Sequence, residues 1–477
     1  MNELKILNPD VRGKKVALIG AGVSNMPLIG FIRAHGGEVT LREKKTEAEL
    51  GARADEIKEL GARLICGEAY LEGMDEDIII RSPGIRPDIP EFSAAVEAGA
   101  MLACEMEMFA ANAPCPVYAV TGSDGKSTTT TILSKLLMPR GVAYLGGNIG
   151  EPLFQKVDTI TENDMAAVEL SSFQLMTMDA PFAAAIITNI TPNHLNWHTG
   201  MDEYIEAKCR ILRHAGKAVL NYDCDVTREI GEKLISDGNV PVTWFSLSEM
   251  KQNCGAERVL FLRDNGDVIV REACGCESIL MNRRNVVLPG RHNIANYMAA
   301  SVAAWEVTTP ELIREIASTF AGVKHRLQFI TEKGGVRYYN SSIDSSPTRT
   351  AAAISALSES APERGIVIIC GGYDKNIPFE PLAEALLDCP IIKKIVLTGA
   401  TRDKIMSALT ESPLYKDADA ERILVVPDFD EAVITASRAA DDGDNVLLSP
   451  ACASFDAFPN FEVRGERFAS IAKSLED

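Results

Sequence analysis

Residues 122–127, Gly-Ser-Asp-Gly-Lys-Ser, combine two glycines, a lysine and a hydroxyl in an order that suits phosphate binding. Glycines let backbone N–H groups approach an anion without an intervening Cβ atom, and a following helix adds its positive N-terminus. Lys126 can neutralise phosphate charge, and the Ser127 hydroxyl can bind Mg²⁺. The spacing, GxxGKS, is shorter than the common GxxxxGKS. Because a strand-like run precedes it and a helix-like run follows, we predict a nucleotide-phosphate loop rather than an ordinary glycine turn.

A carboxylate and two histidines follow later apolar runs of the same segment. Glu169 comes directly after the run 165–168, and the carboxyl end of a parallel strand is where ligands of α/β sheets bind. We therefore expect Glu169 to bind Mg²⁺ opposite Ser127, with a helix-capping acid as the alternative. His194 and His198 lie in a loop, where histidines are more often solvated turn residues than ligands.

Near the N-terminus, Gly20 and Gly22 resemble the start of a dinucleotide-binding fingerprint. The third glycine, which permits close helix–strand packing in NAD and FAD folds, is absent, so a dehydrogenase has weak support. The turn could still bind a pyrophosphate at a helix start, with Ser24 and Asn25 as further donors. A tight turn without any ligand is an equally good interpretation.

The elements that must position these residues follow a repeated pattern of apolar strands and helical stretches, which indicates βαβ units and parallel sheets. The fold class is therefore α/β: a Rossmann-like N-terminal domain, a central P-loop ATPase-like domain with a mostly parallel sheet, and a Rossmann-like C-terminal domain. The expected bounds are 1–112, 113–323 and 324–477, with the proline-containing stretch 111–116 as a linker. Lys208 falls on a predicted helix, where composition alone suggests an ordinary surface lysine.

Composition excludes several classes of function. The 477 residues carry 48 basic and 67 acidic side chains, a net charge of −19, which argues against a nucleic-acid or anionic-membrane binder. The sequence offers no secretory signal and no apolar run long enough to span a membrane, so we expect no membrane insertion and a cytoplasmic protein. The 11 cysteines form no CxxC pair, and reduced thiols fit them better than a zinc site or a disulfide framework.

Eight motifs in order along nearly the whole chain together resemble the Mur ligase family. They are TGSDGKST (121–128), GGNIG (146–150), ELSSFQL (169–175), TNITPNHL (188–195), LPGRHNIAN (288–296), KHR (324–326), GGYDK (371–375) and LSPACASFDAFPNFEVRGERF (448–468). The resemblance implies an ATP-dependent amide ligase of cytoplasmic peptidoglycan synthesis. Such an enzyme would add D-glutamate to UDP-N-acetylmuramoyl-L-alanine through an acyl phosphate, as a monomer acting on small molecules. Its three domains would hold the UDP-sugar, ATP and D-glutamate in that order along the chain.

The resemblance also implies a role for individual residues toward each ligand. The catalytic residues would be Lys126, His194 and Lys208. The nucleotide would contact Gly122, Ser123, Asp124, Gly125, Lys126, Ser127, Thr128, Asn148, Asn293, Asn296, Arg326 and Asp344. Mg²⁺ would be bound by Ser127, Glu169, His194 and Lys208, the lysine being carried as a carbamate. The UDP-sugar would contact Ser24, Asn25, Arg42, Glu43, Lys44, Ser82, Gly84, Asn148 and Ser171. D-glutamate would contact Thr348, Lys375, Ser454 and Phe461.

Two positions depart from the family pattern. Ser346 replaces a lysine that would pair with a substrate carboxylate, and Asn193 replaces an acidic residue before the loop histidine. Either Arg349 supplies the missing charge or the amino-acid preference differs.

Three other functions remain as alternatives. Another Mur ligase or a folylpolyglutamate-synthase-like ligase would share the phosphate loop but use a different acceptor or amino acid. A P-loop ATPase coupled to conformational change is disfavoured, because no clear apolar run ending in aspartate supplies a Walker B motif.

Overall fold

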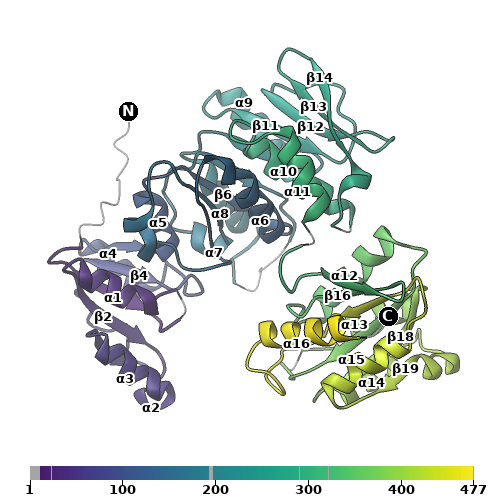
Figure 1. Ribbon diagram of the computed structural model, residues 1–477. Helices are drawn as coiled ribbons and strands as arrows, with labels where there is room; N and C mark the ends of the chain where they lie inside the picture. The colour runs from purple at the N-terminus through teal and green to yellow at the C-terminus, as the bar shows by residue number, and fades with distance from the viewer. Residues whose placement is uncertain are drawn as a thin grey trace. The chain divides into compact units, whose positions relative to one another are not determined.

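The computed structural model describes residues 11–22, 24–192, 197–288, 290–320, 322–375 and 377–475. The chain divides into two compact units. The first consists of Met1–Asn285 and Ile294–Ala317, and the second consists of Val286–Asn293 and Ser318–Asp477. The first unit contains two sheets and the second contains one, and each sheet is drawn with its flanking helices in Figure 1. The described residues include no helix that is long and apolar enough to cross a membrane.

The N-terminal sheet has five parallel strands in the order β3-β2-β1-β4-β5. Its strands are β1 (Lys15–Ile19), β2 (Glu38–Glu43), β3 (Arg63–Cys66), β4 (Ile78–Arg81) and β5 (Met101–Ala103). Four consecutive residues of β1, from Val16, are fully buried, as a central strand covered on both faces requires. The intervening helices are α1 (Met26–Ala34), α2 (Glu47–Leu50), α3 (Ala52–Glu59), α4 (Pro90–Glu97) and α5 (Glu105–Asn112). This sheet matches the expected Rossmann-like pattern.

The central sheet has nine strands in the order β14-β13-β12-β11-β10-β9-β6-β8-β7. They are β6 (Val117–Thr121), β7 (Ala143–Gly147), β8 (Met165–Glu169), β9 (Ala184–Ile187), β10 (Ala218–Asn221), β11 (Val242–Ser246), β12 (Arg258–Leu262), β13 (Asp267–Glu272) and β14 (Glu277–Asn282). Neighbouring strands from β7 to β12 in this order run parallel, and the β12–β13 and β13–β14 pairs are antiparallel. The expected mostly parallel sheet is therefore confirmed.

Helices surround the central sheet and deliver its functional loops. They are α6 (Lys126–Leu137), α7 (Ser172–Leu175), α8 (Met201–Cys209), α9 (Asp225–Asp237), α10 (Arg291–Ala303) and α11 (Pro310–Thr319). The strand β6 lies between β8 and β9, so the segments after these three strands meet at one edge of the sheet. That edge carries the phosphate loop, Glu169 and the loop after β9.

The C-terminal sheet has six strands in the order β15-β16-β20-β17-β18-β19, parallel except for the β15–β16 hairpin. The strands are β15 (Gln328–Lys333), β16 (Val336–Asn340), β17 (Ile366–Gly371), β18 (Ile392–Thr398), β19 (Ile423–Val425) and β20 (Asn445–Leu448). The helices are α12 (Pro347–Ser360), α13 (Glu380–Asp388), α14 (Arg402–Glu411), α15 (Phe429–Arg438) and α16 (Phe461–Ser474). A separate apolar core lies on each face of this sheet, which again gives an α/β sandwich.

Candidate active site

The phosphate loop joins β6 to α6, as the sequence predicts. Gly122 has φ +148° and Gly125 has φ +80°, and both values lie in the region that favours glycine. A Cβ atom on Gly122 would lie 1.9 Å from Thr188 Oγ1, and one on Gly125 would lie 2.4 Å from Asn296 Oδ1. The glycines are therefore required both by backbone conformation and by close packing.

Lys126 is folded back onto this loop. Its Nζ donates to the carbonyl oxygens of Gly122 at 3.0 Å and Ser123 at 2.9 Å. Ser127 and Thr128, which follow in the first turn of α6, are both buried. The ammonium group and the helix N-terminus thus lie at the same end of α6, which gives the loop the two positive features that phosphate binding uses.

Residues after β9 hold the phosphate loop in place, and sequence reasoning assigned them no such role. Asn189 Oδ1 accepts from the Asp124 N–H at 3.0 Å, and Thr188 Oγ1 donates to the Asp124 carbonyl at 2.5 Å. Ser123 Oγ lies 2.9 Å from Tyr204 Oη. The signal that could have found Thr188 and Asn189 is their place directly after a buried strand, the same signal that singled out Glu169.

Glu169 and Asn148 form a second polar group, at the end of β8 and directly after the neighbouring strand β7. Asn148 Nδ2 donates to Glu169 Oε1 at 2.9 Å, and Glu169 is 1% exposed. The other carboxylate oxygen, Oε2, is buried without a hydrogen-bond partner. A buried carboxylate oxygen left unpaired carries a desolvation cost that a bound cation would relieve. The donor set therefore fits Mg²⁺, a hard cation that uses one or two carboxylates together with water and phosphate oxygens.

Lys208 is not the surface lysine that composition suggests. It lies on α8, is 1% exposed, and its Nζ donates to the Gly122 carbonyl at 2.7 Å while lying 4.7 Å from the centre of the Tyr204 ring. Burial, with the nearby charge of Lys126, lowers the pKa of Lys208 to about 6. The lysine is buried because α8 packs its inner face against the loop between β6 and α6.

The structure corrects the expectation that His198 is a solvated turn residue, and it does not describe His194. His198 is buried rather than solvated, with Nδ1 2.8 Å from Glu203 Oε1 and Nε2 2.9 Å from Ser172 Oγ. His194 and Asn193 lie outside the described residues. Within the described part of the chain, no three His, Cys, Asp or Glu side chains gather in a way that could hold a metal ion.

In the N-terminal sheet, polar side chains around the glycine turn after β1 form hydrogen bonds with the backbone of the turn itself. Asn25 Nδ2 donates to the carbonyls of Ile19 at 2.9 Å and Gly20 at 3.1 Å, and Glu43 Oε2 accepts from the Ala21 N–H at 2.8 Å. Ser82 Oγ also donates to the Ile19 carbonyl, at 2.7 Å. These contacts bring Asn25, Glu43 and Ser82 together around the turn, with Ser24 beside them in sequence and partly exposed.

The Arg42 side chain is buried and holds neighbouring segments together, so its charge does not lie at the surface. The side chain is 2% exposed, and its Nε and Nη2 donate to the two carboxylate oxygens of Glu76 at 2.9 and 3.1 Å. Its Nη1 donates to the carbonyls of Tyr70 and Glu72. Lys44, two residues further on, is exposed and lies 3.8 Å from Glu68.

Arg42→Ala should lower the free energy of unfolding by about 3–5 kcal/mol, because it leaves the Glu76 carboxylate buried and uncompensated. Lys44→Ala removes an exposed ion pair from the same strand end and should cost about 0–1 kcal/mol. Urea unfolding of both variants measures the difference. Equal losses would show that Arg42 does not stabilise this sheet.

In the C-terminal unit, the predicted nucleotide residue Asp344 lies after β16. It is buried, accepts from Ser449 Oγ at 2.8 Å, and burial raises its pKa to about 6, an effect that Arg326 partly offsets. Asn293 is buried near the start of α10. In the first unit, Asn296 Oδ1 accepts from Thr129 Oγ1 at 3.1 Å and packs against Gly125.

The predicted amino-acid residues also lie in the C-terminal unit. Lys375 Nζ donates to Ser345 Oγ at 2.9 Å, and Thr348 is exposed at the start of α12, next to Arg349. Burial, with the nearby charge of Arg349, lowers the pKa of Lys375. Ser454 is buried, and the Phe461 carbonyl accepts from Ser342 Oγ at 2.8 Å.

Arg464 holds the loops of this region together, and sequence reasoning missed it. The side chain is 2% exposed and donates to Ser342 and to the carbonyls of Cys452 and Ala453. Arg464 stands among other charged residues of the same helix, Glu462, Glu466 and Arg467, so the sequence gave no signal for its burial.

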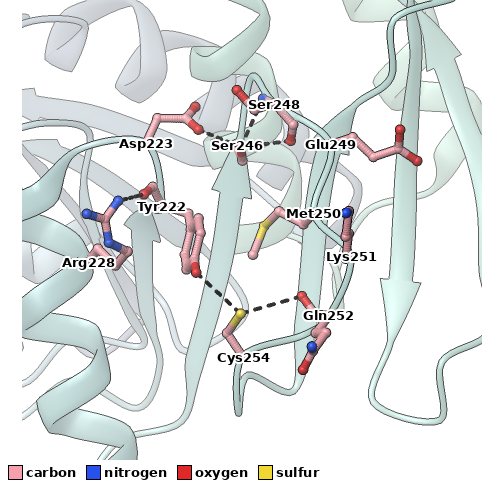
Figure 2. Close-up of a pocket in the computed structure, with 10 residues that line it drawn as sticks. All are labelled: Tyr222, Asp223, Arg228, Ser246, Ser248, Glu249, Met250, Lys251, Gln252 and Cys254. Carbon is pink, nitrogen blue, oxygen red and sulfur yellow. Dashed lines mark hydrogen bonds between the residues drawn. The ribbon is translucent and has the colours of Figure 1, made fainter.

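A separate cavity of about 590 Å³ opens beyond the ends of β10 and β11. Figure 2 shows its lining, with Cys254 Sγ 3.4 Å from Tyr222 Oη and Ser246 donating to Asp223. None of the residues predicted from the sequence lines this cavity. The phosphate loop, Glu169 and Lys208 form a different site.

Comparison with known proteins places this geometry in a family. Residues 120–304 match the Mur ligase middle domain, and residues 325–452 match the Mur ligase glutamate ligase domain. The chain is 42% identical over 470 residues to a UDP-N-acetylmuramoylalanine--D-glutamate ligase of Clostridium botulinum, covering 98% of each chain. It is 43% identical over 474 residues to the enzyme of that name from Clostridium novyi, again covering 98% of each.

Solved structures share the fold at lower sequence identity. The UDP-N-acetylmuramate-alanine ligase of Thermotoga maritima aligns over 97% of this chain and 99% of its own, with a TM-score of 0.57 and 18% identity. MurF from Acinetobacter baumannii aligns over 80% of this chain and 88% of its own, with a TM-score of 0.55 and 19% identity. With near full-length relatives above 40% identity and two matching domains, the chain belongs to the Mur ligase family.

Proposed function

We propose that the chain joins D-glutamate to UDP-N-acetylmuramoyl-L-alanine with ATP, through an acyl phosphate, and releases ADP and phosphate. The relatives that carry this name match almost the entire chain, which supports the choice of both substrates. The observation that carries the chemistry is the meeting of three groups at one sheet edge. Lys126, Glu169 and Lys208 all lie there, and the charges of Lys126 and Glu169 both act on Lys208.

The acid substrate requires activation because a carboxylate is a poor acyl donor at neutral pH. Its alanyl carboxylate attacks the γ-phosphorus of ATP, the bond to ADP breaks, and an acyl phosphate forms. The D-glutamate amine then attacks the acyl carbon, and the tetrahedral oxyanion collapses as phosphate leaves. Lys126 and the amides of residues 122–127 bind the phosphates and offset the charge that develops on them.

ATP and Mg²⁺ are the cofactors that this site suits. Mg²⁺ would be held by Glu169, Ser127, His194 and the carbamate of Lys208. Bound Mg²⁺ would draw charge from the phosphate oxygens. Asn148 orients the Glu169 carboxylate through its 2.9 Å hydrogen bond, which leaves Oε2 for the cation. Asn293, Asn296, Arg326 and Asp344 complete the proposed nucleotide contacts.

The other substrates are assigned by segment. Residues 1–112 would hold the UDP-sugar, and the buried Arg42 would support the fold there. The proposed contacts are Ser24, Asn25, Glu43, Lys44, Ser82 and Gly84 in that segment, with Asn148 and Ser171 from the central segment. Residues 113–323 would hold ATP, and residues 324–477 would hold D-glutamate. We propose that the enzyme acts as a cytoplasmic monomer.

The amino-acid site contains two cations that suit the two carboxylates of glutamate. Arg349 and Lys375 lie close enough that the charge of Arg349 lowers the pKa of Lys375, after the larger effect of burial. Arg349 therefore supplies the charge that Ser346 lacks, and D-glutamate remains the preferred amino acid.

Arg349→Gln should raise the KM for D-glutamate about tenfold, the effect of losing about 1.4 kcal/mol of ionic attraction. The KM values for ATP and the UDP-sugar should stay unchanged. Arg364→Gln serves as the control, because Arg364 lies after α12 and donates to the Gly335 carbonyl away from these groups. An unaltered KM for D-glutamate in Arg349→Gln would show that a residue other than Arg349 pairs with the substrate carboxylate.

The test of the proposed function is ADP release from UDP-N-acetylmuramoyl-L-alanine across a panel of D- and L-amino acids. D-glutamate should give the highest kcat/KM. ADP release that ignores both the UDP-sugar and the amino acid would instead support a P-loop ATPase.

A further inference from the structure

A group of side chains joins the N-terminal sheet to the central sheet within the first unit. Arg86, in the loop after β4, donates from Nη1 and Nη2 to the two carboxylate oxygens of Glu203 on α8, at 3.1 and 3.0 Å. Its Nη1 also donates to the Trp197 carbonyl at 2.8 Å, and its guanidinium lies 5.0 Å from the centre of the Trp197 ring. Trp197 Nε1 in turn donates to the Gly84 carbonyl at 3.0 Å.

His198 extends this group into the central sheet. Its fully buried ring lies 2.8 Å from Glu203 Oε1 on one side and 2.9 Å from Ser172 Oγ on the other. Ser172 begins α7, three residues after Glu169. Arg86, Glu203, His198 and Ser172 therefore form one continuous chain of contacts, which we name the Arg86 latch.

The Arg86 latch connects two parts of the proposed site without itself belonging to either. At one end, Arg86 lies in the loop that contains Ser82 and Gly84, the proposed UDP-sugar contacts. At the other end, α8 carries Tyr204, whose hydroxyl lies 2.9 Å from Ser123 Oγ in the phosphate loop. The loop that would hold the acid and the loop that would hold the γ-phosphate are thus held together through α8.

Arg86 and Glu203 keep their opposite charges near neutral pH, because each holds the other in its ionised form. Hydrogen bonds from Arg86, the largest influence, and from Thr199 and His198 lower the pKa of Glu203 to about 2. The carboxylate is therefore ionised wherever the protein is folded near neutral pH, and the latch does not open by titration of Glu203.

We propose that Arg86, Glu203 and His198 are positioning residues that place the acid substrate for phosphorylation by fixing the loop after β4 against α8. This inference rests on the proposed function. An acid and a γ-phosphate held on separate sheets react only when the distance between them is fixed, and a displacement of about 1 Å can cost a hundredfold in rate. We expect the nucleotide and the UDP-sugar each to bind without the latch, because the side chains proposed to contact them lie outside it.

The chain provides a closely matched control arginine. Arg86 pairs with the Asp88 carboxylate at 2.7 Å as well as with Glu203 at 3.0 Å. Arg258 likewise pairs with two carboxylates, Glu272 at 3.0 Å and Glu306 at 3.1 Å, and lies 5.0 Å from the centre of a tryptophan ring, that of Trp305. Its side chain is 18% exposed, against 23% for Arg86. It joins β12 to residues after α10 and reaches no proposed substrate contact, so the two arginines share their ion pairs and tryptophan contact but differ in location.

The experiment compares Arg86→Gln, Arg86→Lys and Arg258→Gln. For each, we would measure the melting temperature, direct binding of UDP-N-acetylmuramoyl-L-alanine and of a non-hydrolysable ATP analogue, and kcat for ligation. We expect Arg86→Gln to lower kcat about 10- to 100-fold with both dissociation constants within twofold of the wild type. Arg86→Lys, which keeps one ion pair, should recover part of kcat, and Arg258→Gln should leave kcat within twofold.

Similar kcat values for Arg86→Gln and Arg258→Gln would overturn the proposal, as would a loss of kcat that only follows the melting temperature. If Arg86→Gln does not fold, Glu203→Gln, which keeps the shape of the side chain and removes its charge, must show the same separation of kcat from binding. If the wild type and these variants all ligate normally, the positioning role of the latch is wrong and the proposed function stands. A wild-type protein that does not ligate rejects the proposed function.

Discussion

Lys126→Ala should lower the rate of acyl-phosphate formation at least about a hundredfold, the cost of removing one group that stabilises developing charge. Lys126 begins α6, and its Nζ donates to the Gly122 and Ser123 carbonyls, within the loop that phosphates would enter. Bound phosphate oxygens would attract this ammonium group more strongly than neutral carbonyls do, so the side chain would turn toward them. Its loss leaves the departing ADP and the transferred phosphoryl group with one fewer positive charge.

Binding of the UDP-sugar should remain within about twofold of the wild type in this variant, because the contacts proposed for it lie mainly in residues 1–112 and do not include Lys126. Hydroxylamine measures the first step directly, since it converts an acyl phosphate to a hydroxamate in the absence of D-glutamate. Lys135→Ala is the control, because Lys135 is exposed in the last turn of the same helix. Wild-type hydroxamate yield from Lys126→Ala would remove this lysine from the chemistry.

Local sequence patterns were enough to predict the phosphate loop. The apolar run before Gly122 and the helical pattern after Gly125 have nearly the bounds that β6 and α6 take in the structure. Glu169 was found in the same way, as a carboxylate after a buried strand. These features depend on residues close together in sequence, where periodicity and glycine placement determine the conformation.

Features that depend on strand order could not be predicted from one sequence. Lys208 and His198 looked exposed because their neighbours in sequence are polar, yet α8 and the loop before it pack against β6 and α7. The resemblance placed Arg42 among the UDP-sugar contacts, and the segment 70–76 encloses its side chain, which the sequence did not indicate. In each case a distant segment supplies the burial, and burial rather than residue type determines what the side chain can do.

The same burial leads to the second large effect, which concerns Lys208 as a carbamate. A lysine reacts with CO₂ only as the neutral amine, forming an N–C bond and releasing a proton. With its pKa lowered to about 6 by burial and by Lys126, most Lys208 side chains are neutral at pH 7. An ordinary lysine with a pKa of 10.5 would be neutral in about one in three thousand. The environment therefore favours the modification that would turn this cation into a metal-binding carboxylate.

Lys208→Ala should accordingly lower kcat at least about a hundredfold, because it removes a proposed Mg²⁺ ligand at the reacting phosphate. The wild type should lose activity when CO₂ is removed and regain it when bicarbonate is added, and ¹³CO₂ should give a carbamate resonance that the variant lacks. At a fixed concentration of dissolved CO₂, activity should fall as the pH drops below about 6, since protonation then withdraws the reactive amine.

Lys233→Ala, an exposed lysine on α9, is the matched control and should keep both full activity and the response to bicarbonate. An active Lys208→Ala enzyme with no bicarbonate sensitivity in the wild type would show that Lys208 acts only as a packed amine. Its hydrogen bond to the Gly122 carbonyl would then be its whole contribution, made by supporting the phosphate loop from beneath. The two roles separate cleanly because a structural amine needs no CO₂, whereas a carbamate cannot form without it.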